Sequence, residues 1–215
     1  PHLSVTGACS AQWVPIKPKT DAAFLYALMH VLLHETPRER LDLPFLAKRT
    51  ASAYLVGPHG YYLRERATRK PLVWDATTGS ARAHDSADLD EALHAKVEID
   101  AIEIGPDEEV LGDGMLAGET AFDKLVAHMH AYSPEWAAGV CDVPAATMRK
   151  IAHEYVEHAC VGQTIEIEGR QLPYRPVAVT LGKTVNNGWG GYECCWARTV
   201  LATLVGALEV PGGTI

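Results

Sequence analysis

The sequence lacks the features that mark several common classes of protein. No apolar run approaches the ~20 residues that a membrane-spanning helix needs. Acidic residues outnumber basic ones, 27 to 19, for a net charge of −8, and this balance is opposite to that of proteins that coat nucleic acid. The five cysteines include no C-x-x-C pair, so the residues themselves do not indicate a zinc or iron–sulfur site. We therefore expect no direct membrane span, no nucleic-acid partner and no metal ligand in this chain.

What is present is an alternation of helical and strand-like patterns. Apolar residues recur at helical spacing in five segments: 21–35, 45–50, 119–131, 144–159 and 192–208. Short strand-like runs occur at 53–58 and before Asp75, and the residues from Asp75 to Gly79 predict a turn after the second run. Residues 174–182 form a nearly all-apolar run that is typical of a buried strand. Strands that alternate with helices predict an α/β fold, here a Rossmann-like parallel sheet with flanking helices.

The composition divides the chain into three parts. Residues 80–118 are acidic and contain no large aromatic side chain, so we expect an irregular, exposed insertion with a hairpin in it. Residues 1–79 and 119–215 then form the first and second parts of the α/β domain. The chain starts with Pro-His-Leu and stops soon after a glycine turn, and we expect an internal piece of a longer protein.

Two motifs suggest enzyme chemistry that their spacing does not support. His153 and His158 lie on one predicted helix, but a separation of five residues turns them about 140° apart, whereas shared metal ligands need a separation of four. Gly182, Lys183 and Thr184 resemble the end of a phosphate-binding P-loop. The P-loop pattern requires a glycine where this chain has Val177, and the next predicted helix begins only after Gly190 and Gly191. A P-loop-like nucleotide hydrolase that uses Lys183 and Thr184 stays as an alternative.

The start of the first long helix carries an unusual set of charges. Lys17 and Lys19 lie among prolines directly before Thr20 and Asp21, where the helix begins. An acidic residue at this point is favourable to a helix by itself, because the helix start is electropositive. A carboxylate there is also suited to accept two N–H groups from the edge of a guanine, while the lysines face a pyrophosphate. The pattern thus permits both a simple helix cap and a nucleotide site.

Three stretches, in order along the chain, together resemble the molybdopterin oxidoreductases of the dimethyl sulfoxide reductase superfamily. "WVPIKPKTDAAFL" resembles the family pattern W-x-P-I-x-P-G-T-D-x-A-L, "SPEWAAGVCDVPAATMRKIA" a second pattern, and "RPVAVTLGKTVNNGWGG" with the helix to "VPGG" a third. Within this superfamily, the residues of the three stretches are most similar to those of phenylacetyl-CoA:acceptor oxidoreductase large subunits, followed by thiosulfate, polysulfide and tetrathionate reductases.

This resemblance implies a middle domain that binds a bis-molybdopterin guanine dinucleotide cofactor with molybdenum or tungsten. The helix start would contact the guanosine end, and the loop from Leu181 to Asn187 would pass close to the pterins. His2 stands where the family commonly has arginine, and Lys19 where it commonly has glycine. The cofactor-binding residues implied in this way are His2, Lys19, Thr20, Asp21, Leu181, Gly182, Thr184, Asn186 and Asn187.

The resemblance also implies what lies outside this chain. The metal's protein ligand and the cysteines of a [4Fe–4S] cluster belong to other parts of the catalytic subunit, so the chain should hold no catalytic residue and be inactive alone. Its partners would be the remainder of that subunit, together with an iron–sulfur electron-transfer subunit plus a membrane-anchor subunit. We expect a bacterial protein in a cytoplasmic or membrane-associated complex, with a periplasmic location also open. A non-catalytic α/β interaction module, which docks through 80–118, is a further alternative.

Overall fold

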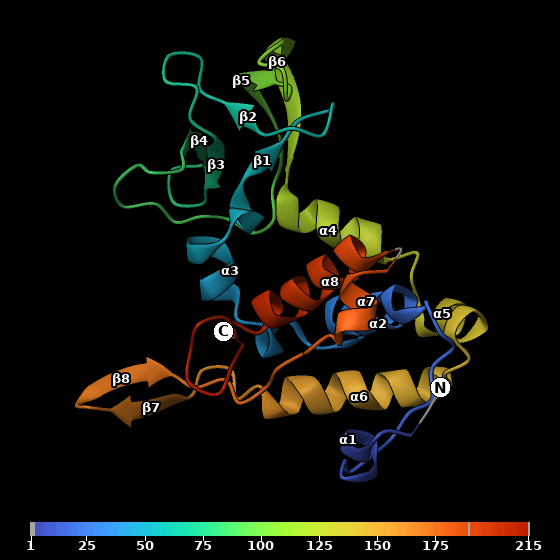
Figure 1. The fold of residues 1–215 in the computed structure, drawn as a ribbon. Coiled ribbons are helices and arrows are strands. Elements are labelled where there is room, and N and C mark those ends of the chain that lie inside the picture. The colour runs from blue at the N-terminus through green and yellow to red at the C-terminus, as the bar shows by residue number, and fades with distance from the viewer. Residues whose placement is uncertain (1–2, 189, 215) are drawn as a thin grey trace. The chain divides into compact units, whose positions relative to one another are not determined.

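The computed structural model describes residues 3–188 and 190–214, and for Thr184 and Asn186 it describes the backbone alone. These residues form two compact units (Figure 1). Unit 1 contains the described residues up to Asp42 and from Met129 onward, and unit 2 is the continuous segment Leu43–His128. The boundaries thus fall at 42/43 and 128/129, whereas the sequence analysis placed them at 79/80 and 118/119.

Unit 1 is built around one helix that is apolar on nearly every side. This helix, α2 (Asp21–His30), continues as a π-helical turn, η1 (Val31–Glu35). It packs against α5 (Pro134–Cys141), α6 (Ala145–His158) and α8 (Gly191–Leu204). Its buried side chains include Leu25, Leu28, Met29 and Leu32, and a helix apolar all round belongs in a core. The remaining helices of the unit are the short α1 (Val5–Ala8), η2 (Arg38–Arg40) and α7 (Lys183–Asn186).

Local sequence signals set the ends of α5. Ser133 caps the helix, because its hydroxyl accepts a hydrogen bond from the Trp136 amide at 3.2 Å, and Pro134 occupies the first helical position. Asp142 ends the helix in the left-handed conformation, at φ 60°. The Cys141 carbonyl then accepts a hydrogen bond from the Lys17 amide at 3.0 Å. The rigid segment before α2 is thereby attached to the end of α5.

Unit 2 contains an antiparallel sheet, two α-helices and a one-turn 3-10 helix. The sheet has the order β1–β6–β5–β2, and a separate hairpin joins β3 to β4. Its strands are β1 (Leu55–Val56), β2 (Leu63–Arg64), β3 (Leu72–Asp75), β4 (Ser80–Ala83), β5 (Lys96–Ile104) and β6 (Val110–Thr120). The helices are α3 (Leu43–Arg49), the one-turn η3 (Ala51–Ala53) and α4 (Ala121–Met129). Leu55, Leu63, Leu72 and Ile99 form the centre of its core.

The parallel Rossmann-like sheet is not found in the described residues. The fold does mix helices and strands, but every named strand pairs antiparallel, and the one parallel bridge, Leu208 to Thr214, is isolated. The expected strand at 174–182 has no regular secondary structure and belongs to no ladder. No backbone hydrogen bond reaches the amides of 178–181 within the described part of the chain. An apolar, β-branched run becomes a strand only beside a partner strand, and the described residues supply none there.

The expected irregular insertion is instead regular structure. Residues 80–118 include β4, all of β5 and most of β6, and β5 and β6 form the long hairpin whose presence we expected. The sequence did not predict a further hairpin that follows α6 (Figure 1). It pairs β7 (Thr164–Ile167) with β8 (Arg170–Pro173).

The predicted helices are confirmed: α2 with η1, α3, α4, α6 and α8 lie within one to four residues of the expected bounds. Among the residues described, no helix is both long and apolar enough to cross a membrane.

Candidate functional site

The start of α2 is a tight turn held by its own backbone and one hydroxyl. Thr20 donates from Oγ1 to the Lys17 carbonyl at 2.7 Å, so its side chain does not cap the helix. The Thr20 carbonyl accepts hydrogen bonds from the amides of Ala23 and Phe24 at 3.1 and 3.4 Å. The first amides of α2 therefore lack a side-chain acceptor among the described residues and are available to a ligand or to water.

The backbone at Lys19 has the conformation that glycine adopts most readily, and glycine is the residue in the similar family pattern. Its φ is 69°, in the left-handed region that favours glycine. The turn thus keeps the glycine-type backbone although the residue is lysine. The side chains of Lys19 and Lys17 are exposed, and neither forms an ion pair with another described residue. Two cations without an acidic partner in the described structure therefore lie directly before the helix.

Asp21 lies at one end of a hollow of about 240 Å³ in unit 1. The hollow is bounded by Val14 and Ile16 before α2, by the first turn of α2, and by Val179–Leu181. The Asp21 carboxylate is half-buried and accepts no hydrogen bond from any described residue. The fold thus brings Asp21 and Leu181 to the same hollow, as the proposed site requires, although 160 positions separate them in sequence.

A second hollow, of about 550 Å³, lies on the Lys19 side of the turn. It is lined by Lys19, Asn187, Glu193 and the glycines before α8. Lys19 and Asn187, which we expected in one site, therefore do share a surface. Glu193 was not expected there; it enters because Gly190, at φ 76°, turns the chain into α8 and so places the helix's first residues at the hollow. The neighbouring Gly190 and Gly191 are the feature of the sequence that could have indicated a ligand site near Glu193.

Cys194, also in the first turn of α8, is a packing residue. Its side chain is buried, and burial, followed by the negative charge of Asp21, raises the pKa of its thiol. A thiol whose pKa is raised is a poor nucleophile and a poor metal ligand at neutral pH.

The loop at 182–187 differs from the expected one. Lys183–Asn186 form the single turn α7, with Gly182 before it, so Lys183 and Thr184 do open a helix, contrary to the sequence prediction. The backbone there closes by short-range bonds from the Val185 and Asn187 amides. The P-loop alternative gains nothing from this turn, because the segment before it is not a strand and Val177 still occupies the glycine position.

The structure describes some of the other predicted residues of this loop with their side chains and others by their backbone alone. Gly182 is exposed, and a Cβ added to it would meet no atom within 4 Å, so the backbone there can be approached closely. Leu181 is half-buried and Asn187 exposed. Thr184 and Asn186 contribute backbone to α7, and their side chains lie outside the description. His2 also lies outside the described residues.

The histidine pair on α6 has no metal-site geometry. His153 and His158 are both exposed. Within the described ranges, no three histidine, cysteine, aspartate or glutamate side chains are placed to hold a metal ion.

Comparison with known proteins gives one informative likeness. No family model matches the chain. It is 28% identical over 226 residues to a sulfite dehydrogenase subunit from Allochromatium vinosum, an alignment that covers 96% of this chain. The chain therefore resembles part of an oxidoreductase. It spans only 22% of that relative's length, so the relative contains far more protein than the two units described above.

Proposed function

We propose that this chain is a cofactor-binding segment of the catalytic subunit of a molybdopterin oxidoreductase of the dimethyl sulfoxide reductase superfamily. The observation that carries the proposal is the convergence at the start of α2. Asp21 shares a hollow with Leu181, and Lys19 shares one with Asn187. Both pairs join the first and the third of the sequence stretches that resemble this superfamily. The likeness to part of a sulfite dehydrogenase supports the same general class of enzyme.

The residues at this turn fit the guanosine end of a molybdopterin guanine dinucleotide. The Asp21 carboxylate has no partner among the described residues and can accept the two parallel N–H groups of a guanine edge. Lys17 and Lys19 are exposed and unpaired within the described structure, so they can face the pyrophosphate. The uncapped first amides of α2 offer further donors to an anionic group.

The segment 178–181, which belongs to no strand or helix, supports a larger assembly. The Asp21 hollow is lined in part by Val179, Thr180 and Leu181. Residues 178–180 also line a different, apolar hollow of about 270 Å³ beside α6. Their amides have no backbone partner within the described chain. We infer that strands from other parts of the catalytic subunit pair with this segment and form a parallel sheet with it.

Bound molybdenum or tungsten would supply the redox chemistry, and the residues described here would hold and orient one nucleotide end of its cofactor. The [4Fe–4S] cluster and the metal's protein ligand would then belong to other parts of the catalytic subunit. The iron–sulfur subunit and the membrane-anchor subunit would be separate partners. The chain alone should therefore have no turnover.

Two resemblances bear on the substrate, and we give more weight to the sulfite dehydrogenase relative than to the three motifs. The motifs are most similar to phenylacetyl-CoA:acceptor oxidoreductases, whereas the relative is named for sulfite. Because this likeness extends over nearly the whole chain, we infer a substrate among the sulfur oxyanions. The full-length protein should oxidise sulfite with an artificial electron acceptor and leave phenylacetyl-CoA unchanged; the reverse result would restore the phenylacetyl-CoA branch.

The first prediction tests Asp21 directly. In the full-length protein, Asp21→Asn should lower the bound guanine nucleotide at least about tenfold, because the amide replaces one acceptor by a donor that faces the donors of guanine, and charged hydrogen bonds contribute about 1.5–3 kcal/mol. The measurement is GMP released by acid hydrolysis, together with molybdenum and tungsten content, per mole of purified protein.

Glu157→Gln is the matched control, because Glu157 is an exposed acid of unit 1 with no partner among the residues described. It should leave cofactor content unchanged. A folded Asp21→Asn protein with full GMP and metal would remove the guanine assignment.

A further inference from the structure

We propose that unit 2 carries a separate binding site for a small zwitterion, a molecule with an ammonium group and a carboxylate such as a free α-amino acid. The site is a polar hollow of about 450 Å³ between the end of α3 and the β3–β4 hairpin. Its charged and polar lining comes from Lys48, Arg49, Tyr54, His84 and Glu91. All of these residues belong to unit 2, so the proposal does not depend on the cofactor assignment in unit 1.

Opposite charges line this hollow without meeting. Lys48 and Arg49, in the last turn of α3, form no ion pair or hydrogen bond with any described residue through their side chains. The Glu91 carboxylate likewise has no partner in the described ranges, and its Oε2 is shut off from solvent without a donor. The other carboxylate oxygen, Oε1, is not shut off from solvent and also has no donor in the described ranges, so Oε1 is the oxygen that a bound ammonium group can reach.

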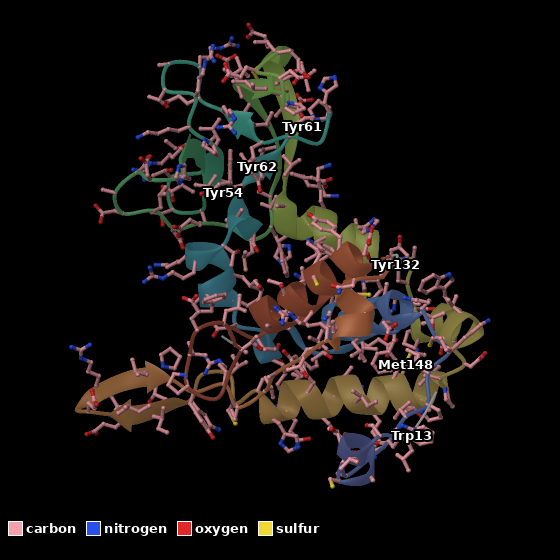
Figure 2. All side chains as sticks on the ribbon, in the orientation of Figure 1. Trp13, Tyr54, Tyr61, Tyr62, Tyr132 and Met148 are labelled. Carbon is pink, nitrogen blue, oxygen red and sulfur yellow. The ribbon has the colours of Figure 1, made fainter. Side chains whose placement is uncertain are left out.

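Tyr54 and His84 add a neutral hydrogen-bonding pair to the same wall. The Tyr54 hydroxyl lies 3.0 Å from His84 Nδ1, and the tyrosine ring also meets Tyr62 edge to face at 5.2 Å (Figure 2). Burial, followed by the nearby Tyr62 and Asp85, raises the pKa of Tyr54, which therefore keeps its proton. Whichever atom donates within the pair, one further N–H or O–H remains for the hollow.

The neighbouring acid does not cancel the two cations. Asp85 is already paired, since Lys70 Nζ lies 2.6 Å from its carboxylate. The hollow therefore combines two cations and one carboxylate that lack partners in the described structure, with one neutral donor. A simple anion would satisfy the cations but leave Glu91 without a donor, and a simple amine would do the reverse. A zwitterion satisfies both groups at once, and a hollow of this volume lies in the range of small-molecule sites.

The test uses glycine as the probe, because it is the smallest α-amino acid. Equilibrium dialysis of the full-length protein against radiolabelled glycine should show one bound equivalent at saturation. Acetate and methylamine, which each carry one half of the charge pattern, should displace it only at concentrations at least tenfold higher. No glycine bound at millimolar concentration, or acetate that competes as well as glycine, would overturn the proposal.

Variants distinguish this hollow from other glycine sites. Glu91→Gln and Arg49→Gln should each weaken glycine binding at least tenfold. Neither change removes a hydrogen bond or ion pair within the described residues, so both proteins should fold, and circular dichroism checks this. Lys96→Gln, which removes an exposed cation of unit 2 outside the hollow, should bind glycine normally. Glycine binding that persists unchanged in both hollow variants would also overturn the proposal.

Discussion

Lys19 shows how one backbone angle links sequence and site. A non-glycine residue in the left-handed region costs about 1–2 kcal/mol, and this chain accepts that cost directly before its helix start, at φ 69°. The same turn orients the Lys17 carbonyl toward the Thr20 hydroxyl and leaves the first amides of α2 without a side-chain cap. A glycine-type conformation that persists without glycine indicates that the shape of the turn is needed.

The strain at this residue predicts the effect of a β-branched side chain. Lys19→Val should lower the free energy of unfolding by about 1–2 kcal/mol, because valine tolerates positive φ less well than lysine does. Lys19→Gly should change it by less than about 1 kcal/mol, since relief of strain is offset by a more flexible unfolded chain. Urea denaturation measures both.

The control is Lys17→Val, at an exposed position whose φ is not positive. Equal losses in Lys17→Val and Lys19→Val would show that the backbone angle has no energetic consequence.

The β3–β4 hairpin is the element whose turn the sequence predicted most fully. The turn from Asp75 to Gly79 is confirmed, with the Gly79 amide 2.9 Å from the Asp75 carbonyl. The Asp75 carboxylate accepts a hydrogen bond from the Thr77 amide at 3.0 Å and another from Arg82 Nη1 at 2.7 Å. One side chain thus joins the turn to the facing strand.

The turn should loosen in acid. Arg82, followed by the hydrogen bonds from Thr78 and Thr77, lowers the pKa of Asp75 from 3.8 to about 2, against the opposing effect of burial. A folded-state pKa below the unfolded value means that the stabilisation is complete above about pH 4 and is lost as the pH falls through about 2. NMR titration of the Asp75 carboxyl and the Thr77 amide should give this midpoint.

Arg82→Met should raise the Asp75 midpoint toward 3.8, because it removes the largest cause of the shift. Arg64→Met should leave the midpoint in place, since Arg64 donates to the Arg69 carbonyl and not to a carboxylate. An Asp75 midpoint that stays low in Arg82→Met would contradict the pairing.

At the scale of the whole molecule, the chain consists of one interrupted unit and one continuous unit. Unit 2 is a single segment with its own core of fully buried leucines and its own sheet, whereas unit 1 is assembled from both flanks of that segment. A continuous segment with its own core is the usual form of a domain that folds alone.

Unit 2 should therefore fold when residues 43–128 are expressed alone. We expect a dispersed amide NMR spectrum and a cooperative unfolding transition. Leu63→Asp, which places a charge at a fully buried core position, should abolish both. A collapsed, undispersed spectrum from the unsubstituted segment would show that unit 2 needs unit 1 to fold.

The sequence determined the five helices that helical spacing of apolar residues predicts, and only the tertiary structure decided the sheets and the sites of this protein. Helix α5 was not among the predicted helices, although its start carries a local signal: the Ser133 cap and Pro134 act within one turn. The run 174–182 has the composition of a strand but forms no ladder, because a strand's hydrogen bonds come from another segment and the described residues supply no partner there. Glu193 and the hollow around Glu91 were missed for the same reason, whereas Leu181 was named only because the family resemblance implied it. Helices are closed by bonds between near neighbours, whereas sheets and hollows form between residues that the chain holds far apart.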